Sequence, residues 1–136
     1  MGKRSYLAFD FGASSGRAII GTIDGGRMSL NEVHRFVNGP KEVDGSLHWD
    51  FPAQIAAIKD GIRKALAVEK NLVSIAIDTW GVDYVLIRRD GSPVRLPYHY
   101  RDTRTDGVPE QVFKLVPETE IYRRTGIQLM QLNTLY

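Results

Sequence analysis

The sequence contains no cysteine. This absence excludes a disulfide framework, a catalytic thiol and a metal site built from thiolates. Long apolar runs are also missing, because the first hydrophobic stretch after the basic N-terminus, residues 6–9, stops at Asp10. Such a stretch is too short for a transmembrane helix or for the apolar segment of a signal peptide. We therefore expect a cytoplasmic protein with no membrane partner.

Neither sign of charge is in large excess, since 18 Lys and Arg residues nearly balance 16 Asp and Glu residues. The basic pairs at 88–89 and 123–124 lack the aromatic residues that accompany them in a nucleic-acid-binding surface. We expect them on solvated faces and expect no nucleic-acid partner. The three histidines, His34, His48 and His99, do not have the spacing of metal ligands, which predicts packing or surface roles and no zinc site.

The most distinctive stretch is residues 6–17, where a short apolar run ends in Asp10 and is followed by the small residues of 12–16 and by Arg17. Exposed N–H groups and hydroxyls in such a turn can hold phosphate, and a carboxylate beside them can face a cation. A plain hairpin with a solvated Asp10 explains the same residues. The stretch alone leaves both interpretations open, and it matches neither of the common glycine-rich nucleotide motifs.

The first half of the chain predicts an α/β domain. Apolar runs at 6–9, 18–20 and 28–36, separated by turn residues, predict an antiparallel meander of three strands. The connector at 38–49 is polar and is expected to be exposed. Asp50 as N-cap, followed by apolar residues at three- and four-residue spacing, predicts a helix over 51–68 that packs on the sheet.

A fourth strand is predicted at residues 72–77, again ending in a carboxylate, Asp78. A strand that follows a helix lies parallel to its neighbour, so Asp10 and Asp78 are expected to end adjacent strands and to open onto one crevice. Residues 84–87 predict a fifth strand, closed by a turn at 90–91. The expectation is one mixed five-stranded sheet with flanking helices.

From residue 97 the pattern changes to aromatic and charged residues with little helical period, which is typical of a site loop or a domain edge. Two short helices are predicted to begin at Pro109 and Pro117, the second ending at Gly126. The tail at 127–136 remains apolar to its last residue. It predicts contact with the remainder of a longer chain or self-association with another copy.

Four motifs together resemble the FGGY family of carbohydrate kinases: Asp10 with the turn at 12–16, Asp78–Asp83, Tyr100–Thr105 and Thr125–Gln128. The resemblance spans the whole chain and implies the ribonuclease H-like, actin-type ATPase fold. Family members bind ATP and sugar between two such domains. The resemblance therefore implies that residues 1–136 form the N-terminal part of the first domain, with strands and helix to about residue 90, and that the second domain is absent.

The resemblance further implies ATP-dependent phosphorylation of a ketose, with L-rhamnulose converted to L-rhamnulose 1-phosphate as the favoured reaction. ATP and Mg²⁺ are the implied cofactors, and Asp10 matches the carboxylate near the magnesium ion. Gly81 matches a sugar-contacting position, while an indole from Trp80 and a carboxylate from Asp83 beside it suit a ketose. The implied ATP-phosphate loop consists of Ala13, Ser14, Ser15, Gly16 and Arg17.

The catalytic aspartate of the family is expected beyond residue 136, so this chain alone is expected to be inactive. Structural roles stay open for several residues: core packing for Trp80, a cap or an ion pair for Asp83, and a salt-bridged loop for Arg101, Asp102 and Arg104. Two other functions also stay open. One is a non-catalytic actin-like scaffold, and the other is a two-metal nuclease that uses Asp10 and Asp78.

Overall fold

The computed structural model describes residues 2–136 and divides the chain into two compact units. The first unit consists of the residues up to Gly39 together with Asp50–Trp80. The second unit consists of Pro40–Trp49 together with Gly81–Tyr136. Each unit has its own buried residues and its own candidate site.

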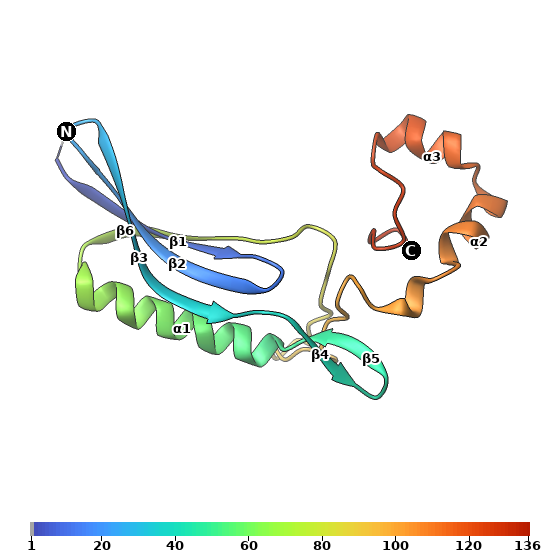
Figure 1. The fold of residues 1–136 in the computed structure, drawn as a ribbon, viewed down its shortest axis with the longest axis horizontal. Coiled ribbons are helices and arrows are strands. Elements are labelled where there is room, and N and C mark those ends of the chain that lie inside the picture. Colours follow the sequence, from blue (N-terminus) through green and yellow to red (C-terminus); the bar gives the residue numbers. More distant parts are fainter. Residues whose placement is uncertain (1) are drawn as a thin grey trace. The chain divides into compact units, whose positions relative to one another are not determined.

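The first unit contains a mixed four-stranded sheet with the strand order β3-β2-β1-β6 (Figure 1). Its first three strands form the antiparallel meander that the sequence predicts, and β6 lies parallel to β1 on the other side. The parallel pairing matches Leu7 with Ile75 and Asp10 with Asp78. The bounds of the strands are β1 Arg4–Phe11, β2 Ser15–Asp24, β3 Arg27–Val37 and β6 Leu72–Asp78.

Helix α1, Phe51–Val68, has the bounds that the sequence predicts. The Asp50 carboxylate caps it by accepting a hydrogen bond from the Ala53 N–H at 3.2 Å. The helix runs along the sheet (Figure 1) and contacts β1, β2 and β3. It covers a core of apolar side chains that alternate along the first two strands. That core consists of Leu7, Phe9, Phe11, Ala18 and Ile20, with Ala65 from the helix.

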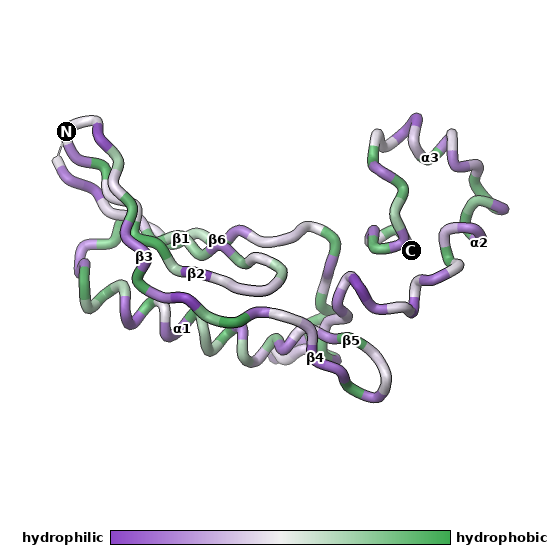
Figure 2. The backbone as a smooth tube through the Cα atoms, viewed as in Figure 1, coloured by the Kyte–Doolittle hydropathy of each residue, from purple (hydrophilic) through white to green (hydrophobic). Residues whose placement is uncertain are grey.

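Strand β6 is an edge of the sheet and is poorly covered. Ile75 and Ile77 share the face of their β1 neighbours, yet they are 47% and 53% exposed. The apolar stretches of β1 and β6 run beside each other in Figure 2. The hydrophobic face of the sheet therefore extends beyond the area that α1 covers.

The predicted fifth strand at 84–87 is wrong. Those residues instead form a small closed turn, in which the Val94 N–H donates to the Leu86 carbonyl at 2.8 Å and Ile87 forms an isolated bridge with Pro93. The Arg88 guanidinium closes the turn by donating to two carbonyls, Pro93 and Val94. The predicted turn at 90–91 is present inside it. Leu86 and Ile87 therefore pair with Val94 and Pro93 rather than with β6, and the sheet has four strands.

The second unit begins with a hairpin of β4, Pro40–Val43, and β5, Ser46–Trp49. Asp44 and Gly45 form its turn with φ values of 51° and 80°, as a two-residue Asp-Gly hairpin requires. The sequence-based expectation of an exposed connector is wrong here, because Trp49 is only 1% exposed and His48 9%. The apolar run 47–49 faces a second small core.

The remaining elements of the second unit are η1, Thr103–Thr105, α2, Val108–Leu115, and α3, Glu118–Thr125. Both predicted helices are confirmed, and Gly126 ends α3 in the left-handed region with φ of 63°. The tail turns back on its own unit. The Asn133 amide donates to the Gln128 carbonyl, and the Tyr136 ring packs edge-on against Phe113.

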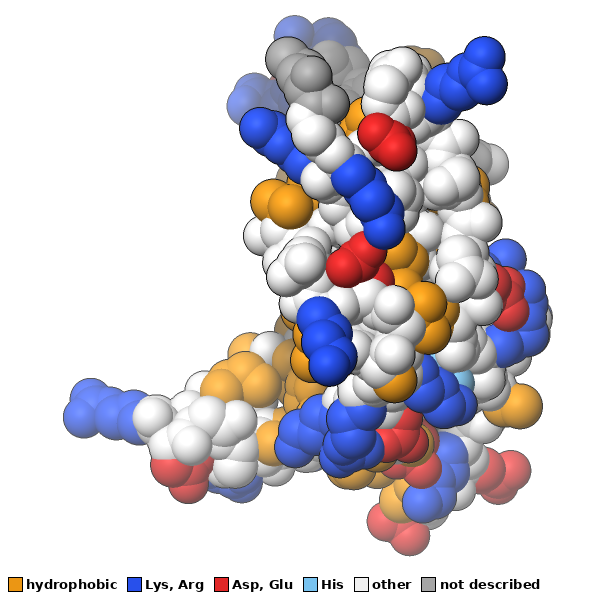
Figure 3. All heavy atoms as spheres, turned by 90° about the vertical axis from the view of Figure 1, so that its left-hand side faces the viewer, with side chains coloured by type: hydrophobic (Ala, Val, Ile, Leu, Met, Phe, Trp, Pro, Cys, Tyr) orange, Lys and Arg blue, Asp and Glu red, His pale blue; other side chains and the backbone are white. Residues whose placement is uncertain are grey.

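Charges are mixed on the face shown in Figure 3, where Lys and Arg side chains are separated by Asp, Glu and uncharged groups. On this face the basic side chains do not form a continuous track. Among residues 2–136, no helix has the length and apolar character needed to cross a bilayer.

Candidate functional site

The first candidate site lies where β1 passes into β2. Asp10 is paired with Arg17 across the hairpin and with Asp78 across the parallel pairing, so the three side chains share one face. The Arg17 Nε lies 3.1 Å from the Asp10 Oδ2. The predicted meeting of Asp10 and Asp78 at adjacent strand ends is therefore confirmed, and Arg17 brings a positive charge beside them.

The connecting turn is held in shape by hydrogen bonds at its base. The Gly12 N–H donates to the Ser15 carbonyl at 3.0 Å, and the Asn38 N–H donates to the Ser14 carbonyl at 3.0 Å. The buried Asn38 amide also donates to the Gly12 carbonyl at 2.7 Å. Within residues 2–136, no main-chain hydrogen bond is formed by the N–H groups of Ala13 and Ser14. These two donors remain available at the exposed tip.

Asn38 is a site residue that sequence reasoning missed, because Asn-Gly-Pro indicates only a break in structure. The Asn38 side chain is 5% exposed, and its Oδ1 accepts a hydrogen bond from Gln54 of α1 at 2.9 Å. It thereby ties the turn to the N-terminal part of the helix. No local pattern could have shown this contact, since its partners lie far apart in the sequence.

Two glycines let the turn pack closely. A Cβ on Gly16 would lie 2.2 Å from the Phe36 Cζ, and a Cβ on Gly12 would lie 3.0 Å from the Ser15 carbonyl oxygen. Side chains at these positions would displace the Phe36 ring or the main chain of the turn. The tip consists of small residues and presents main-chain donors together with the hydroxyls of Ser14 and Ser15. This donor set fits the oxygens of a phosphate chain.

The carboxylates beside the turn fit magnesium only together with phosphate. Among residues 2–136, no group of three or more acidic or histidine side chains is placed to hold a metal ion. Magnesium is commonly held by one or two carboxylates, with phosphate oxygens and water completing its shell. Asp10, with Asp78 next to it, meets this requirement for a magnesium–nucleotide complex.

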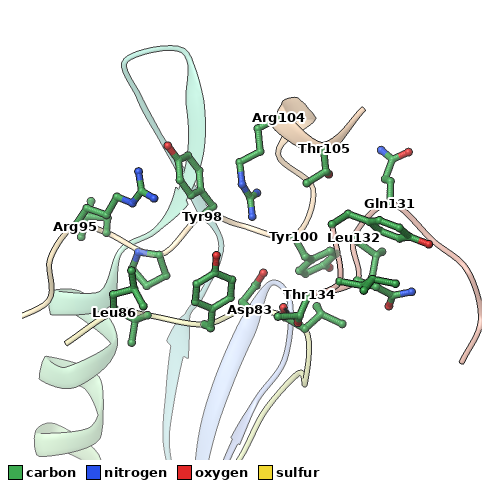
Figure 4. Close-up of a pocket in the computed structure, with 18 residues that line it drawn as sticks. Asp83, Leu86, Arg95, Tyr98, Tyr100, Arg104, Thr105, Gln131, Leu132 and Thr134 are labelled. Atoms are coloured by element: carbon green, nitrogen blue, oxygen red, sulfur yellow. Dashed lines mark hydrogen bonds between the residues drawn. The ribbon is translucent and has the colours of Figure 1, made fainter. Parts of the chain in front are cut away.

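The second candidate site is a pocket of about 170 Å³ in the second unit. Figure 4 shows Asp83 and Thr134 on one side of it, with Tyr98, Arg104 and Tyr100 on the facing loop. The pocket lining also includes Leu86, Arg95, Thr105, Gln131 and Leu132. The pocket combines aromatic rings with a carboxylate, hydroxyls and guanidinium groups, which suits a small polar molecule that also has C–H faces.

The three predicted sugar-contacting residues have different surroundings. Asp83 lines the pocket. Gly81 is exposed, and a Cβ built on it meets nothing within 4 Å. Trp80 belongs to the first unit, where it packs on the core and lies edge-on to Phe11 at 6.5 Å between ring centroids. Sugar contact by these residues stays a prediction, and for Trp80 the packing interpretation has a direct observation behind it.

The loop that carries Tyr98 and Arg104 is built around a buried carboxylate. Asp102 is 3% exposed, and its two oxygens accept hydrogen bonds from the main-chain N–H groups of Leu47 and Arg104. The Arg104 guanidinium stacks over the Tyr98 ring at 4.3 Å from the centroid. The loop is thus fixed against β5 with Arg104 held on an aromatic face.

His99 is buried beside the same loop. Its ring packs against those of Trp49 and Tyr100, with centroid distances of 4.1 and 4.4 Å, and the residue is 1% exposed. The Nδ1 atom accepts the Arg101 N–H at 3.0 Å, so the neutral ring carries its proton on Nε2. Burial lowers the pKa of His99 and the Arg101 charge acts in the same direction, while Asp83 and Asp102 oppose them.

We expect the lowered pKa of His99 to make the protein less stable in mild acid. The unfolded ring binds a proton near pH 6.5 and the folded ring binds it only at lower pH, so stability is complete above pH 6.5 and falls below it. Burial also lowers the pKa of the more exposed His34, with Lys64 beside it, and this adds a smaller loss of the same sign.

Urea unfolding at pH 7.5 and pH 5.0 measures the effect. The free energy of unfolding should fall between the two, and His99→Asn, whose Oδ1 replaces Nδ1 as acceptor, should show a smaller fall. An equal fall in both proteins would show that His99 is not responsible.

Comparison with curated proteins finds close relatives along the whole chain. The chain is 43% identical over 134 residues to a rhamnulokinase from Bacteroides thetaiotaomicron. This alignment covers 98% of this chain and 28% of the relative. The chain is also 43% identical over 138 residues to a rhamnulokinase from Klebsiella pneumoniae, covering 100% of this chain and 28% of the relative. The chain therefore spans just over a quarter of the length of these two proteins.

Solved structures with low sequence identity share the fold. Gluconate kinase from Lactobacillus acidophilus superposes with a TM-score of 0.73 at 13% identity, over 96% of this chain and 26% of that structure. Glycerol kinase from Plasmodium falciparum, solved with ADP, gives 0.69 at 17% identity, over 98% of this chain and 27% of that structure. Together with the strand order, these matches confirm the predicted ribonuclease H-like, actin-type ATPase fold.

The family comparison agrees with both. Residues 5–136 match the N-terminal domain of the FGGY carbohydrate kinases, which is nearly the entire chain. The resemblance carried by the four sequence motifs is thereby confirmed, and the chain belongs to the FGGY family of carbohydrate kinases.

Proposed function

We propose that the protein to which this chain belongs phosphorylates a ketose with ATP, converting L-rhamnulose to L-rhamnulose 1-phosphate. The observation that carries the proposal is the 43% identity with two rhamnulokinases along the whole chain. Because the chain covers 28% of each relative, the reaction is proposed for the complete protein. These 136 residues supply part of its nucleotide and sugar sites.

The β1–β2 turn is the proposed nucleotide-phosphate site. The free N–H groups of Ala13 and Ser14 donate to phosphate oxygens, and Arg17 adds a fixed positive charge. Asp10 holds magnesium, which when bound neutralises charge on the phosphoryl group being transferred. Gly16 allows the turn to pack against the Phe36 ring, because any larger residue at this position would collide with that ring.

The pocket of the second unit is the proposed sugar site. Tyr98 and Tyr100 offer flat apolar surfaces to C–H groups, and Asp83 accepts hydrogen bonds from hydroxyls. Asp83 is the sole carboxylate among the lining residues. Its Oδ2 accepts a hydrogen bond from the Trp49 indole, which suits an orienting group more than a proton-abstracting base. We therefore assign the general base to a part of the protein outside these residues.

Two blocking variants test the proposal. Binding of L-rhamnulose and of magnesium-ATP is measured by calorimetry on the wild-type chain, Thr134→Trp and Ser14→Trp. Thr134 lines the pocket, and both positions are exposed, so an indole fits without disturbing the core. Thr134→Trp should remove sugar binding alone, and Ser14→Trp should remove nucleotide binding alone. Ser29→Trp, on the exposed side of β3, is the matched control and should bind both ligands.

Several outcomes would contradict parts of this proposal. A folded wild-type chain that releases no heat with either ligand would exclude an independent site in these residues. Loss of both ligands in both variants would show misfolding rather than blocking. Sugar phosphorylation by the purified chain would show that it contains the base, and magnesium-dependent cleavage of nucleic acid would support the nuclease alternative.

A further inference from the structure

Trp49 connects the core of the second unit to the wall of the pocket. It is the last residue of β5 and is 1% exposed. Its main-chain N–H donates to the Pro97 carbonyl at 2.9 Å, and its ring packs against His99 and Tyr100. Both the backbone and the ring are therefore held in place by the segment that carries the aromatic side of the pocket.

The indole N–H of Trp49 donates to the Oδ2 of Asp83. An indole nitrogen can only donate, so this contact requires an acceptor and fixes which way the carboxylate turns. Asp83 itself lies among the pocket-lining residues, and in Figure 4 it extends toward the loop of Tyr98 and Tyr100. A buried, rigid ring thus orients a carboxylate at the pocket wall.

A carboxylate offers about four acceptor positions, so a bond from Trp49 leaves capacity for ligand hydroxyls. The Trp49 bond restrains χ1 and χ2 of this side chain before ligand binds, so less conformational freedom is lost on binding. The consequence is a carboxylate oriented to accept hydrogen bonds from the hydroxyls of a polyol.

We propose that Trp49 is a positioning residue for sugar recognition, which holds the Asp83 carboxylate so that it accepts hydrogen bonds from hydroxyls of a ketose in the pocket. This inference rests on the proposed function, because it assumes that the pocket receives the sugar. It adds a residue that the motifs of the sequence did not indicate. Trp49 acts through Asp83 and touches no reacting atom.

Two substitutions separate the hydrogen bond from packing. Trp49→Phe keeps an apolar ring but removes the donor, whereas Trp49→His is smaller and keeps a ring N–H. We expect Trp49→Phe to raise the dissociation constant for L-rhamnulose at least tenfold and Trp49→His to restore most of the affinity. If packing alone mattered, the smaller histidine would bind more weakly than phenylalanine, and that order would overturn the proposal.

The indole N–H also gives a direct spectroscopic readout. The chain has two tryptophans, so a ¹⁵N-labelled sample shows two indole signals, and Trp80→Phe identifies them. The Trp49 signal should move with L-rhamnulose along the same saturation curve as the calorimetric binding. The positioning role would be overturned if the Trp49 signal did not shift when sugar binds, or if the sugar affinity of Trp49→Phe were within twofold of wild type. Neither result would contradict the sugar pocket itself.

Asp83→Asn tests the same link if Trp49→Phe proves unfolded. The amide oxygen can still accept from the indole, so the fold should persist while sugar affinity falls at least tenfold. Combining it with Trp49→His should add at most a twofold further loss, because the two residues act as one unit. Unchanged affinity in Asp83→Asn would overturn the proposal. An absence of saturable L-rhamnulose binding in the wild type would instead contradict the sugar pocket, and the inference with it.

Discussion

Replacing Asp102 with alanine is expected to lower the free energy of unfolding of the second unit by about 3 kcal/mol. The carboxylate is 3% exposed and accepts the Leu47 N–H at 2.7 Å and the Arg104 N–H at 3.0 Å. Alanine leaves both donors without their acceptor and removes a hydrogen bond between β5 and the pocket loop. Because the lost partner is charged, each bond is stronger than an ordinary one.

Urea denaturation with a near-ultraviolet signal from the aromatic cluster around Trp49 measures this loss. Asp102→Asn is the matched control, since its amide oxygen replaces one acceptor and its nitrogen cannot replace the other. It should lose about half as much stability as Asp102→Ala. A loss below about 1 kcal/mol in Asp102→Ala would mean that water replaces the carboxylate and that the loop does not depend on it.

Replacing Gly61 with leucine should cost the first unit about 3 kcal/mol. A Cβ at this position would lie 2.5 Å from the Phe9 Cε1 and 3.1 Å from the Ala18 Cβ. Phe9 is 1% exposed and cannot move aside, so α1 must lift from the sheet. Leucine is a better helix former than glycine by about 0.8 kcal/mol, so a net loss comes from packing.

Lys59→Leu is the control for the Gly61 prediction. It introduces the same side chain at an exposed position of α1 and should change stability by less than about 0.5 kcal/mol. Thermal and urea unfolding are measured for Lys59→Leu, for Gly61→Leu, for Phe9→Ala and for the double variant that combines Gly61→Leu with Phe9→Ala. The loss in free energy of unfolding in the double variant should be at least about 1 kcal/mol smaller than the sum of the losses in the two single variants, because the obstructing ring is gone. Strict additivity would contradict the proposed clash.

The first unit could be predicted from the sequence because its signals are local. The apolar alternation of β1 and β2 and the cap at Asp50 each specify one element, and the crossover rule then places β6 beside β1. The meeting of Asp10 and Asp78 follows from that placement. The run at 84–87 has the same local signal as a strand, but its Arg88 closes it on itself, and no local pattern shows that competition.

The second unit could be predicted only in part, because its contacts join distant segments. An Asp-Gly pair such as Asp44-Gly45 is typical of a hairpin turn, yet the burial of Trp49 depends on residues 97–100, about 50 positions away. Asn38 and Asp102 look like loop residues and are instead buried acceptors and donors. The family motifs predict Asp83 near a ligand, and the three-dimensional arrangement shows that the Trp49 indole holds it.

The order of the strands also sets how fast the first unit can fold. The hairpins β1–β2 and β2–β3 close short loops, whereas β6 reaches β1 only after the intervening chain, including α1, has been brought round. Closing the longer loop costs chain entropy, and this cost is offset only after the Leu7–Ile75 and Phe9–Ile77 pairs have formed. We therefore expect β6 to dock late, and we expect the exposed isoleucines of this strand to promote aggregation until it has docked.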